Sequence, residues 1–208
     1  MRLILASTSP RRREILALLG LPFEVIAPKF DELVSPHRPI KEEVLEFSIG
    51  KARSVAGENH DSVVIASDTM IGLMEKKFGK PIGTDDAKDM LRALAGKTHQ
   101  IFTGVAIVDG LGGPGLDWIE EVSVRMRAYS DDEIQRYVSR GESLDKAGAY
   151  SIQGHGCGLI ESIDGDYLAA VGLPLKPIAH YLQSRGFTLP LDVEQLYADK
   201  SFLNWESF

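Results

Sequence analysis

The chain has 208 residues and a formal net charge of −7, with a pI of about 5.3. Its 44% hydrophobic and 25% charged residues are close to the averages of globular domains, so the chain can bury an ordinary core. The negative charge disfavours general DNA or RNA binding, because a protein that holds a phosphate backbone usually carries a basic surface. If this protein binds an anion, it must gather positive charge locally.

The sequence also bears on the compartment. Cys157 is the only cysteine, so an intramolecular disulfide is impossible, which suits a cytoplasmic location. The apolar run before Ser7 is too short for a signal peptide, and no apolar run approaches the ~20 residues of a membrane span. We therefore expect a cytoplasmic protein with no membrane association and no stable nucleic-acid complex.

The first half of the chain alternates short apolar runs with helical patterns. The elements predicted there are strands over 3–6 and 23–26, a helix that Ser9 caps and Gly20 ends, and a helix over 42–55. The run 63–66 predicts a buried central strand. Ser67, Asp68 and Thr69 follow it at once, so we expect these polar residues at the carboxyl end of that strand.

The second half continues this alternation. It predicts a helix from Thr84 to Gly96, strands over 101–108 and 119–128, a helix from a capping box at 130–133 to Gly141, and a last helix over 173–185. The runs 158–163 and 167–171 flank Asp164-Gly165 and predict a hairpin. No structure is assigned to the tail, 188–208, which can pack on its own chain or on a partner. The whole predicts one mixed α/β domain over 1–208.

The first polar segment, 7–12, joins a predicted strand to the start of a helix. Several backbone N–H groups are free at a helix N-terminus, and the helix dipole favours an anion there. Arg11 and Arg12 are therefore badly placed for helix stability unless a phosphate binds beside them. Taken alone, the segment fits a phosphate site and an ordinary helix start with surface arginines equally well.

Three further segments place polar groups after apolar elements. Asp68 after a buried strand fits a metal ligand or general base, and equally an Asx turn. Lys80 after Gly79 fits a phosphate contact or a plain turn. The long loop 141–154 is rich in small residues and is typical of functional loops. In it, the Gln153 amide can read the edge of a base or make a loop hydrogen bond.

Two glycine-rich stretches are rejected as functional motifs. Gly96-Lys97-Thr98 lacks the leading glycine and the preceding strand of a phosphate-binding loop. His155 and Cys157 have no clustered Cys or His that would complete a zinc site.

The order and spacing of these segments resemble the Maf family of nucleoside triphosphate pyrophosphatases. The resemblance runs from Leu5 to about Gly186 and rests on the stretches 6–12, 31–32, 51–52, 66–69, 79–81, 103–105, 145–150, 152–154 and 171–175. It implies an α/β fold with a mixed twisted sheet, flanking helices and two lobes around a central cleft. That fold is shared with the house-cleaning inosine triphosphate pyrophosphatases. The resemblance also suggests a homodimer.

The implied reaction is cleavage between the α- and β-phosphates, which gives a nucleoside monophosphate and pyrophosphate and requires Mg²⁺ or Mn²⁺. Asp68 matches the family's general base, acting on water directly or through the metal, and Asp68 and Glu32 match the metal site. The positions that match the family's substrate-binding cleft are Ser7, Arg11, Arg12, Lys51, Thr69, Lys80, Lys146 and Gln153. Of these, Arg11, Thr69 and Gln153 match positions associated with substrate choice. The stretches 146–150 and 152–154 resemble the branch that acts on dTTP and UTP, with modified pyrimidine nucleotides as further substrates.

Two alternatives remain open. One is a 7-methyl-GTP pyrophosphatase with the same fold and reaction. The other is a nucleotide-binding regulator of septum formation or cell division, which would not need the paired carboxylates of Glu32 and Asp68. The chain departs from the family pattern at 48–50, 70–74 and 110–116. These departures involve no proposed catalytic group, but they weaken the inference about substrate range.

Overall fold

A seven-stranded mixed sheet runs through the middle of the protein in this computed structural model, which describes residues 1–35 and 37–208. Its strands follow the order β2-β1-β3-β5-β6-β7, and the short β4 also pairs with β3. β1 is parallel to β2 and β3, and all other pairs are antiparallel. The strands are β1 (Arg2–Ala6), β2 (Glu24–Ile26), β3 (Ser62–Leu73), β4 (Lys76–Phe78), β5 (Thr98–Asp109), β6 (Leu116–Met126) and β7 (Ile160–Asp164).

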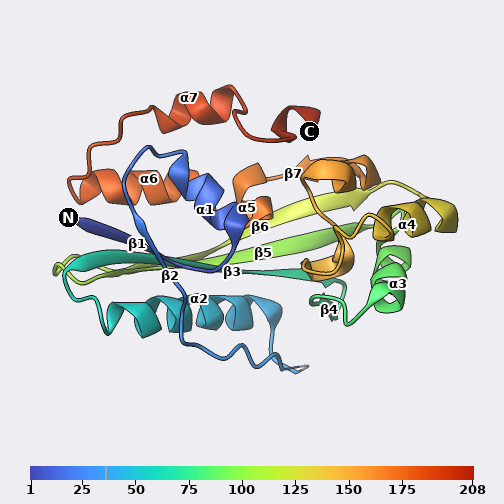
Figure 1. The fold of residues 1–208 in the computed structure, drawn as a ribbon, viewed down its shortest axis with the longest axis horizontal. Helices are drawn as coiled ribbons and strands as arrows, with labels where there is room; N and C mark the ends of the chain where they lie inside the picture. Colours follow the sequence, from blue (N-terminus) through green and yellow to red (C-terminus); the bar gives the residue numbers. More distant parts are fainter. Residues whose placement is uncertain (36) are drawn as a thin grey trace.

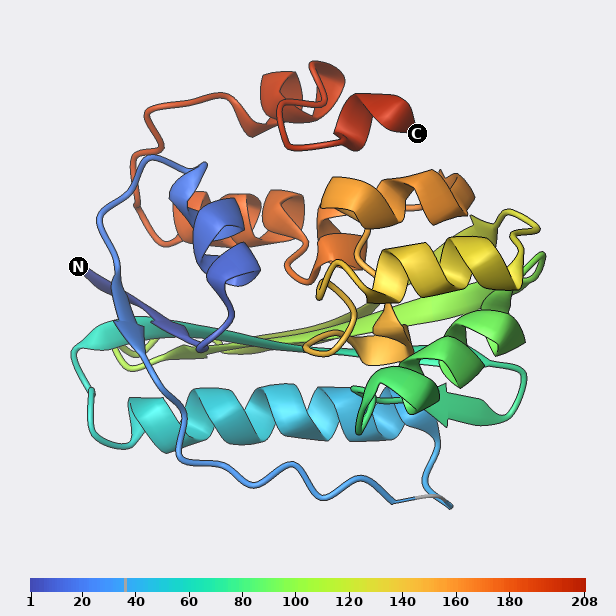
Figure 2. The same ribbon diagram turned by 45° about the vertical axis from the view of Figure 1, so that its right-hand side comes forward.

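Helices cover both faces of this sheet (Figure 1). One face carries α2 (Ile40–Ala56), and the other carries α1 (Pro10–Ala17), α5 (Tyr167–Val171) and α6 (Leu175–Ser184), with α7 (Val193–Ala198) outside α6. Two further helices, α3 (Thr84–Leu94) and α4 (Asp131–Val138), lie side by side at the end of the sheet near β4 (Figure 2). The 3-10 turns are η1 (Ala147–Ala149), η2 (Gly154–Leu159) and η3 (Trp205–Ser207). No helix in the described ranges combines the length and the apolar character needed to cross a bilayer.

The central strand β3 is buried on both faces, and its side chains alternate between two cores. Val63 and Ile65 belong to the larger core, under α1, α5 and α6, whereas Val64 and Ala66 belong to a smaller core against α2. Successive side chains of a strand point to opposite faces. The same alternation continues into the polar part of the strand. It directs Asp68 towards α2, and Ser67 and Thr69 towards α1 and α5.

One edge of β3 is open in its middle. β1 pairs with β3 only as far as Ile65, and β4 begins to pair at Ile71. Along that edge, 66–70 has no partner strand in the described part of the chain, although its other edge pairs with β5 throughout. Asp68 therefore lies in the middle of a long strand. Our prediction that it stands at the carboxyl end of a strand is wrong.

Most predicted elements are confirmed, including the capping box, in which Ser130 and Glu133 exchange hydrogen bonds at the start of α4. The hairpin around Asp164-Gly165 is wrong. Residues 160–164 form β7, but 167–171 form α5. The reason is Asp166, whose carboxylate accepts hydrogen bonds from the N–H groups of Leu168 and Ala169 and so caps a helix. A short apolar run fits a buried helix and a buried strand equally well, so the cap decides.

The tail is also ordered. Asp192 caps α7 in the same way, and the segment as far as Phe208 packs on its own chain. Tyr167 stacks on Trp205 at 5.3 Å and on Phe208 at 6.0 Å between ring centroids. Of the two possibilities left open for the tail, packing in cis is the one observed.

Candidate active site

A cleft of about 500 Å³ opens at the unpaired edge of β3. This volume lies within the usual range for sites that bind a small molecule or nucleotide. All ten residues predicted from the sequence line it: Ser7, Arg11, Arg12, Glu32, Lys51, Asp68, Thr69, Lys80, Lys146 and Gln153. They come from the start of α1, the loop after β2, α2, β3, the turn after β4 and the loop around η1. The fold thus brings distant segments into one cavity.

The centre of the cleft is an ion cluster around Lys51. Its Nζ lies 2.5 Å from Asp68 Oδ1 and 2.6 Å from Glu32 Oε1. Lys51 and Asp68 are nearly covered, with 7% and 9% of their side chains exposed, whereas 49% of the Glu32 side chain is exposed. The pair exists because Asp68 faces α2, which carries Lys51. Within the described part of the chain Asp68 Oδ2 makes no hydrogen bond, so it can accept one from a bound water or ligand.

Arg12 occupies the opposite side of β3. Its Nε donates to the carbonyl of Gly172 at 3.1 Å, and its Nη2 donates to Thr69 Oγ1 at 3.2 Å. Ser67 Oγ donates to the same Gly172 carbonyl at 2.8 Å. Burial lowers the pKa of Arg12, against the charges of Asp68 and Glu32, which raise it. Arg12 is therefore a fixed, partly desolvated cation and not a surface arginine.

The start of α1 offers its backbone to the cleft. Ser9 stands at the N-cap position, but within the described chain its side chain makes no capping hydrogen bond. Our prediction that Ser9 caps this helix is therefore only half right: the position is correct, and the cap is absent. Instead Ser7 Oγ accepts from the N–H of Ser9 at 3.1 Å, which folds the loop tightly before the helix. The first-turn N–H groups are left for another acceptor, as at an anion site.

Two lysine-bearing segments of the cleft lining meet. The N–H of Gly148 donates to the carbonyl of Gly79 at 3.1 Å, which fixes the loop of Lys146 beside that of Lys80. Gly148 has a φ of +67°, where a side chain would be strained. Lys146 pairs with Asp145 at 2.5 Å. Burial raises the pKa of Asp145, but the hydrogen bond from Lys146 and the charges of Lys146 and Arg11 outweigh it, so the pKa is lowered.

Gln153 lines the cleft from the loop between η1 and η2. The residue is 8% exposed, and its Nε2 is buried without a partner among the described residues. A buried donor without a hydrogen-bond partner costs desolvation free energy, so an acceptor on a bound ligand would remove that cost. Tyr150 also lines the cleft, and its hydroxyl lies 2.7 Å from Nε2 of the buried His99. Desolvation lowers the pKa of His99 to about 4, so this imidazole is neutral near pH 7.

Sequence reasoning missed three residues that shape the site. Lys77 lines the cleft and pairs with the fully buried carboxylate of Glu43 on α2. Gly50 lets Phe30 lie against α2, since a Cβ there would sit 2.2 Å from the Phe30 ring. Phe30 also packs edge-on against Phe47, and this anchors the loop that carries Glu32. The only signal for Gly50 was the departure of 48–50 from the family pattern.

The charge of the lining contrasts with that of the whole protein. Six cationic side chains line the cleft against three carboxylates: Arg11, Arg12, Lys51, Lys77, Lys80 and Lys146 against Glu32, Asp68 and Asp145. The cleft is thus positive on a chain whose net charge is −7. Such local charge attracts a polyanion while the acidic surface repels nonspecific ones.

Residues 2–185 match the family described as Maf-like protein. The chain belongs to the Maf family. It is 44% identical over 181 residues to the dTTP/UTP pyrophosphatase of Moorella thermoacetica, which covers 87% of this chain and 93% of that protein. It is 38% identical over 182 residues to the dTTP/UTP pyrophosphatase of Bacillus cereus strain G9842, with 88% and 94% covered.

The fold is also similar to that of a solved structure, the Staphylococcus aureus Ham1 protein. The TM-score is 0.50 at 15% identity, and the match covers 89% of this chain and all of that one. At this identity the similarity concerns the fold alone. The predicted fold class, a mixed sheet with flanking helices around a cleft, is therefore confirmed in this Maf protein.

The carboxylates of this Maf protein fit a divalent cation only in part. Within 1–35 and 37–208, no group of three or more His, Cys, Asp or Glu side chains is arranged to hold a metal ion. However, Glu32 Oε1 and Asp68 Oδ1 lie 2.6 Å and 2.5 Å from the same Lys51 Nζ. Mg²⁺ usually takes one or two carboxylates and completes its shell with waters and substrate phosphates. Glu32 and Asp68 are oxygen donors of this kind, and Lys51 Nζ lies between them in this structure.

Proposed function

We propose that this protein is a nucleoside triphosphate pyrophosphatase that hydrolyses dTTP and UTP, together with modified pyrimidine nucleotides, to the monophosphate and pyrophosphate. The observation that carries the proposal is the ion cluster in which Lys51 joins Glu32 and Asp68 inside a positive cleft. Membership of the Maf family and the names of the two relatives support the same reaction.

The triphosphate binds along the cationic walls. Arg12, already held by Gly172 and Thr69, contacts phosphate oxygens without a large loss of side-chain freedom. The N–H groups at the start of α1 and the hydroxyl of Ser7 add neutral donors. Lys80 and Lys146 close over the phosphates from the opposite wall as point charges.

The base lies at the Gln153 end. Gln153 Nε2 donates to a pyrimidine carbonyl, and its Oε1 accepts from the N3–H of uracil or thymine. Arg12, which Gly172 and Thr69 hold, serves the phosphates, and Arg11 serves substrate choice, as the resemblance to the family implies.

The reaction is attack of water on the α-phosphorus. Asp68 Oδ2 takes a proton from the water, whose oxygen forms the new bond to phosphorus, while the bond to the α–β bridging oxygen breaks and pyrophosphate leaves. Lys51 holds Asp68 Oδ1 and so fixes the carboxylate for this role. Phosphoryl transfer depends mainly on such positioning and on charge neutralisation.

Glu32 and Asp68 are the residues that would hold Mg²⁺ or Mn²⁺ together with the substrate phosphates. When bound there, the cation supplies additional neutralisation of phosphate charge.

Hydrolysis of dTTP in ¹⁸O-labelled water tests the proposal. Attack at the α-phosphorus puts the label into dTMP and leaves pyrophosphate unlabelled. Label in pyrophosphate, or release of orthophosphate in its place, would contradict the reaction assigned to Asp68.

A further inference from the structure

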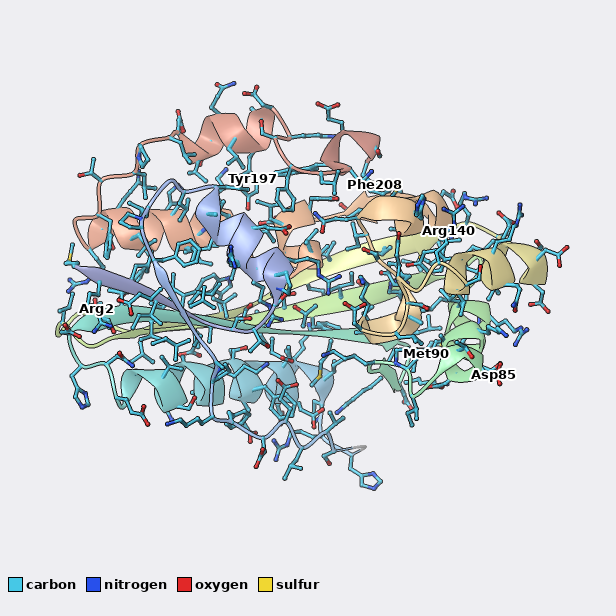
Figure 3. All side chains as sticks on the ribbon, in the orientation of Figure 1. Arg2, Asp85, Met90, Arg140, Tyr197 and Phe208 are labelled. Atoms are coloured by element: carbon cyan, nitrogen blue, oxygen red, sulfur yellow. The ribbon has the colours of Figure 1, made fainter. Side chains whose placement is uncertain are left out.

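The C-terminal segment 192–208 lies beyond the part of the chain that matches the Maf family, which ends at 185. It contains α7 and η3 and lies on the outer side of α5 and α6, where Figure 3 labels Tyr197 and Phe208. Its start is fixed by Tyr197, whose hydroxyl donates to Asp166 at 2.9 Å and accepts from the N–H of Leu175 at 3.2 Å.

The end of this segment is fixed just as firmly. Trp205 is only 7% exposed and stacks on Tyr167. The hydroxyl of Tyr167 donates to the carbonyl of Leu203 at 2.6 Å. Asn204 lies between these two anchored residues, in the left-handed conformation with a φ of +62°. Asparagine adopts this conformation at lower cost than most residues.

Asn204 reaches from this segment to the backbone beside Gln153, which lines the cleft. Its Oδ1 accepts a hydrogen bond from the N–H of Gly154 at 2.8 Å, and its Nδ2 lies 3.6 Å from Cys157 Sγ. Gly154 directly follows Gln153 and has a φ of +66°. The contact therefore holds the backbone next to Gln153, whose side chain lines the cleft.

Three hydrogen bonds hold the backbone N–H groups of this loop. Tyr137 accepts from Ser151 at 2.9 Å, and Ser151 Oγ accepts from Gln153 at 3.2 Å. Asn204 supplies the third bond, and it alone of these acceptors lies outside the family match.

We infer that Asn204 is a positioning residue for nucleotide choice, which acts by fixing Gly154 and hence the Gln153 amide. The inference rests on the proposed function, because it takes Gln153 to face the base. The segment 192–208 thereby contributes to the cleft without lining it, since none of its residues belongs to the cavity wall.

Two substitutions of Asn204 separate the effect of its hydrogen bond to Gly154 from the effect of its left-handed backbone conformation. Asn204→Gly keeps the left-handed conformation but removes the acceptor, whereas Asn204→Asp keeps both the acceptor and a tolerable φ. Glu206→Gln changes an exposed neighbour in the same turn and is the matched control. The measurements are KM and kcat of pyrophosphate release for dTTP, UTP and dCTP.

We expect Asn204→Gly to raise KM for dTTP and UTP about two- to tenfold, the range for one neutral hydrogen bond, with kcat changed less than about twofold. The preference over dCTP should shrink. Asn204→Asp and Glu206→Gln should behave like the unmodified protein. An unchanged KM in Asn204→Gly would overturn the inference. So would a fall in kcat that is equal for all nucleotides with no change in KM. The same rise of KM in Asn204→Asp would also overturn it.

Cys157 provides a readout that needs no turnover. Its thiol is the only one in the chain and lies beside Asn204, so its rate of reaction with a thiol reagent reports whether the segment stays docked. Faster reaction in Asn204→Gly than in Glu206→Gln supports the inference, and equal rates overturn it. Absence of pyrophosphate release by the unmodified protein would refute the proposed function but leave this measurement valid.

Discussion

Lys51 Nζ and Asp68 Oδ1 lie 2.5 Å apart, although one residue is on α2 and the other is in the middle of β3. The contact follows from the alternation of β3, which turns Asp68 towards α2 exactly where β1 no longer covers the strand edge. It requires α2 to lie very close to the sheet.

Asp68→Asn removes the proposed base and keeps the size of the side chain. We expect pyrophosphate release from dTTP to fall at least ~10²-fold, in keeping with the usual contribution of a general base. Circular dichroism and the melting temperature should show an intact fold, because asparagine still accepts a hydrogen bond from Lys51. Turnover near that of the unmodified protein would refute the role of Asp68.

Lys51→Met keeps the aliphatic stem but leaves the buried Asp68 carboxylate without its cation. Breaking a buried ion pair from one side typically costs about 3 kcal/mol or more, whereas half-exposed Glu32 is easily rehydrated. We expect this loss in urea unfolding at pH 7.5. The double variant Lys51→Met/Asp68→Asn should regain most of the stability without regaining activity. A single variant as stable as the unmodified protein would show that the pair is unimportant for the fold.

Gly104→Ala tests the close approach of α2. Gly104 of β5 pairs with Asp68 of β3, and a Cβ on Gly104 would lie 2.6 Å from the Val44 carbonyl and from Ser48 Oγ. Because the carbonyl is backbone of α2, the helix itself must move, and overpacking of this kind costs about 1–3 kcal/mol. Gly158→Ala is the matched control, since nothing lies within 4 Å of its Cβ. Equal unfolding free energies for the two variants would contradict the packing described.

His99 makes the stability of the protein depend on pH. Desolvation lowers its pKa to about 4 from an ordinary value of 6.5, so between these values the unfolded chain binds a proton that the folded chain does not. Stability should therefore fall as the pH drops from about 6.5 towards 4, by about 3 kcal/mol in total from this residue. His99→Gln cannot charge but can still bond to Tyr150. Urea unfolding at pH 7.5 and pH 5 should show a smaller difference for the variant, and an identical difference would exclude His99 as the cause.

The sequence predicts the helices and strands of this fold better than it predicts which of them pair or pack together in space. Apolar periodicity identifies β3, but it stops at Ala66 because the next side chains face a cleft and a polar network rather than the core. The length of β3 is set by its pairing with β5, a strand that is distant from β3 in the sequence. In the same way, α5 has the composition of a strand, and only the carboxylate of Asp166 marks it as a helix.

The candidate site was predictable only as a set of separate segments. Nothing local indicates that Lys51 lies between Glu32 and Asp68, because that contact depends on the packing of α2 against the sheet. The resemblance to the Maf family supplied those residues. It gave no indication of Lys77 with Glu43, or of Asn204, which lies outside the matched range. The three aromatic residues Phe202, Trp205 and Phe208 are the one local feature of the tail that fits packing on an apolar surface.

Release of pyrophosphate across a panel of nucleotides decides between pyrimidine and purine nucleotides as substrates of this Maf protein. The panel contains dTTP, UTP, dCTP, dATP, GTP and 7-methyl-GTP, each with Mg²⁺ or Mn²⁺ and with Asp68→Asn as the blank. The account predicts rapid release from dTTP and UTP and little from the purine nucleotides. Release from 7-methyl-GTP with none from dTTP or UTP, or binding of nucleotide without any release, would contradict it.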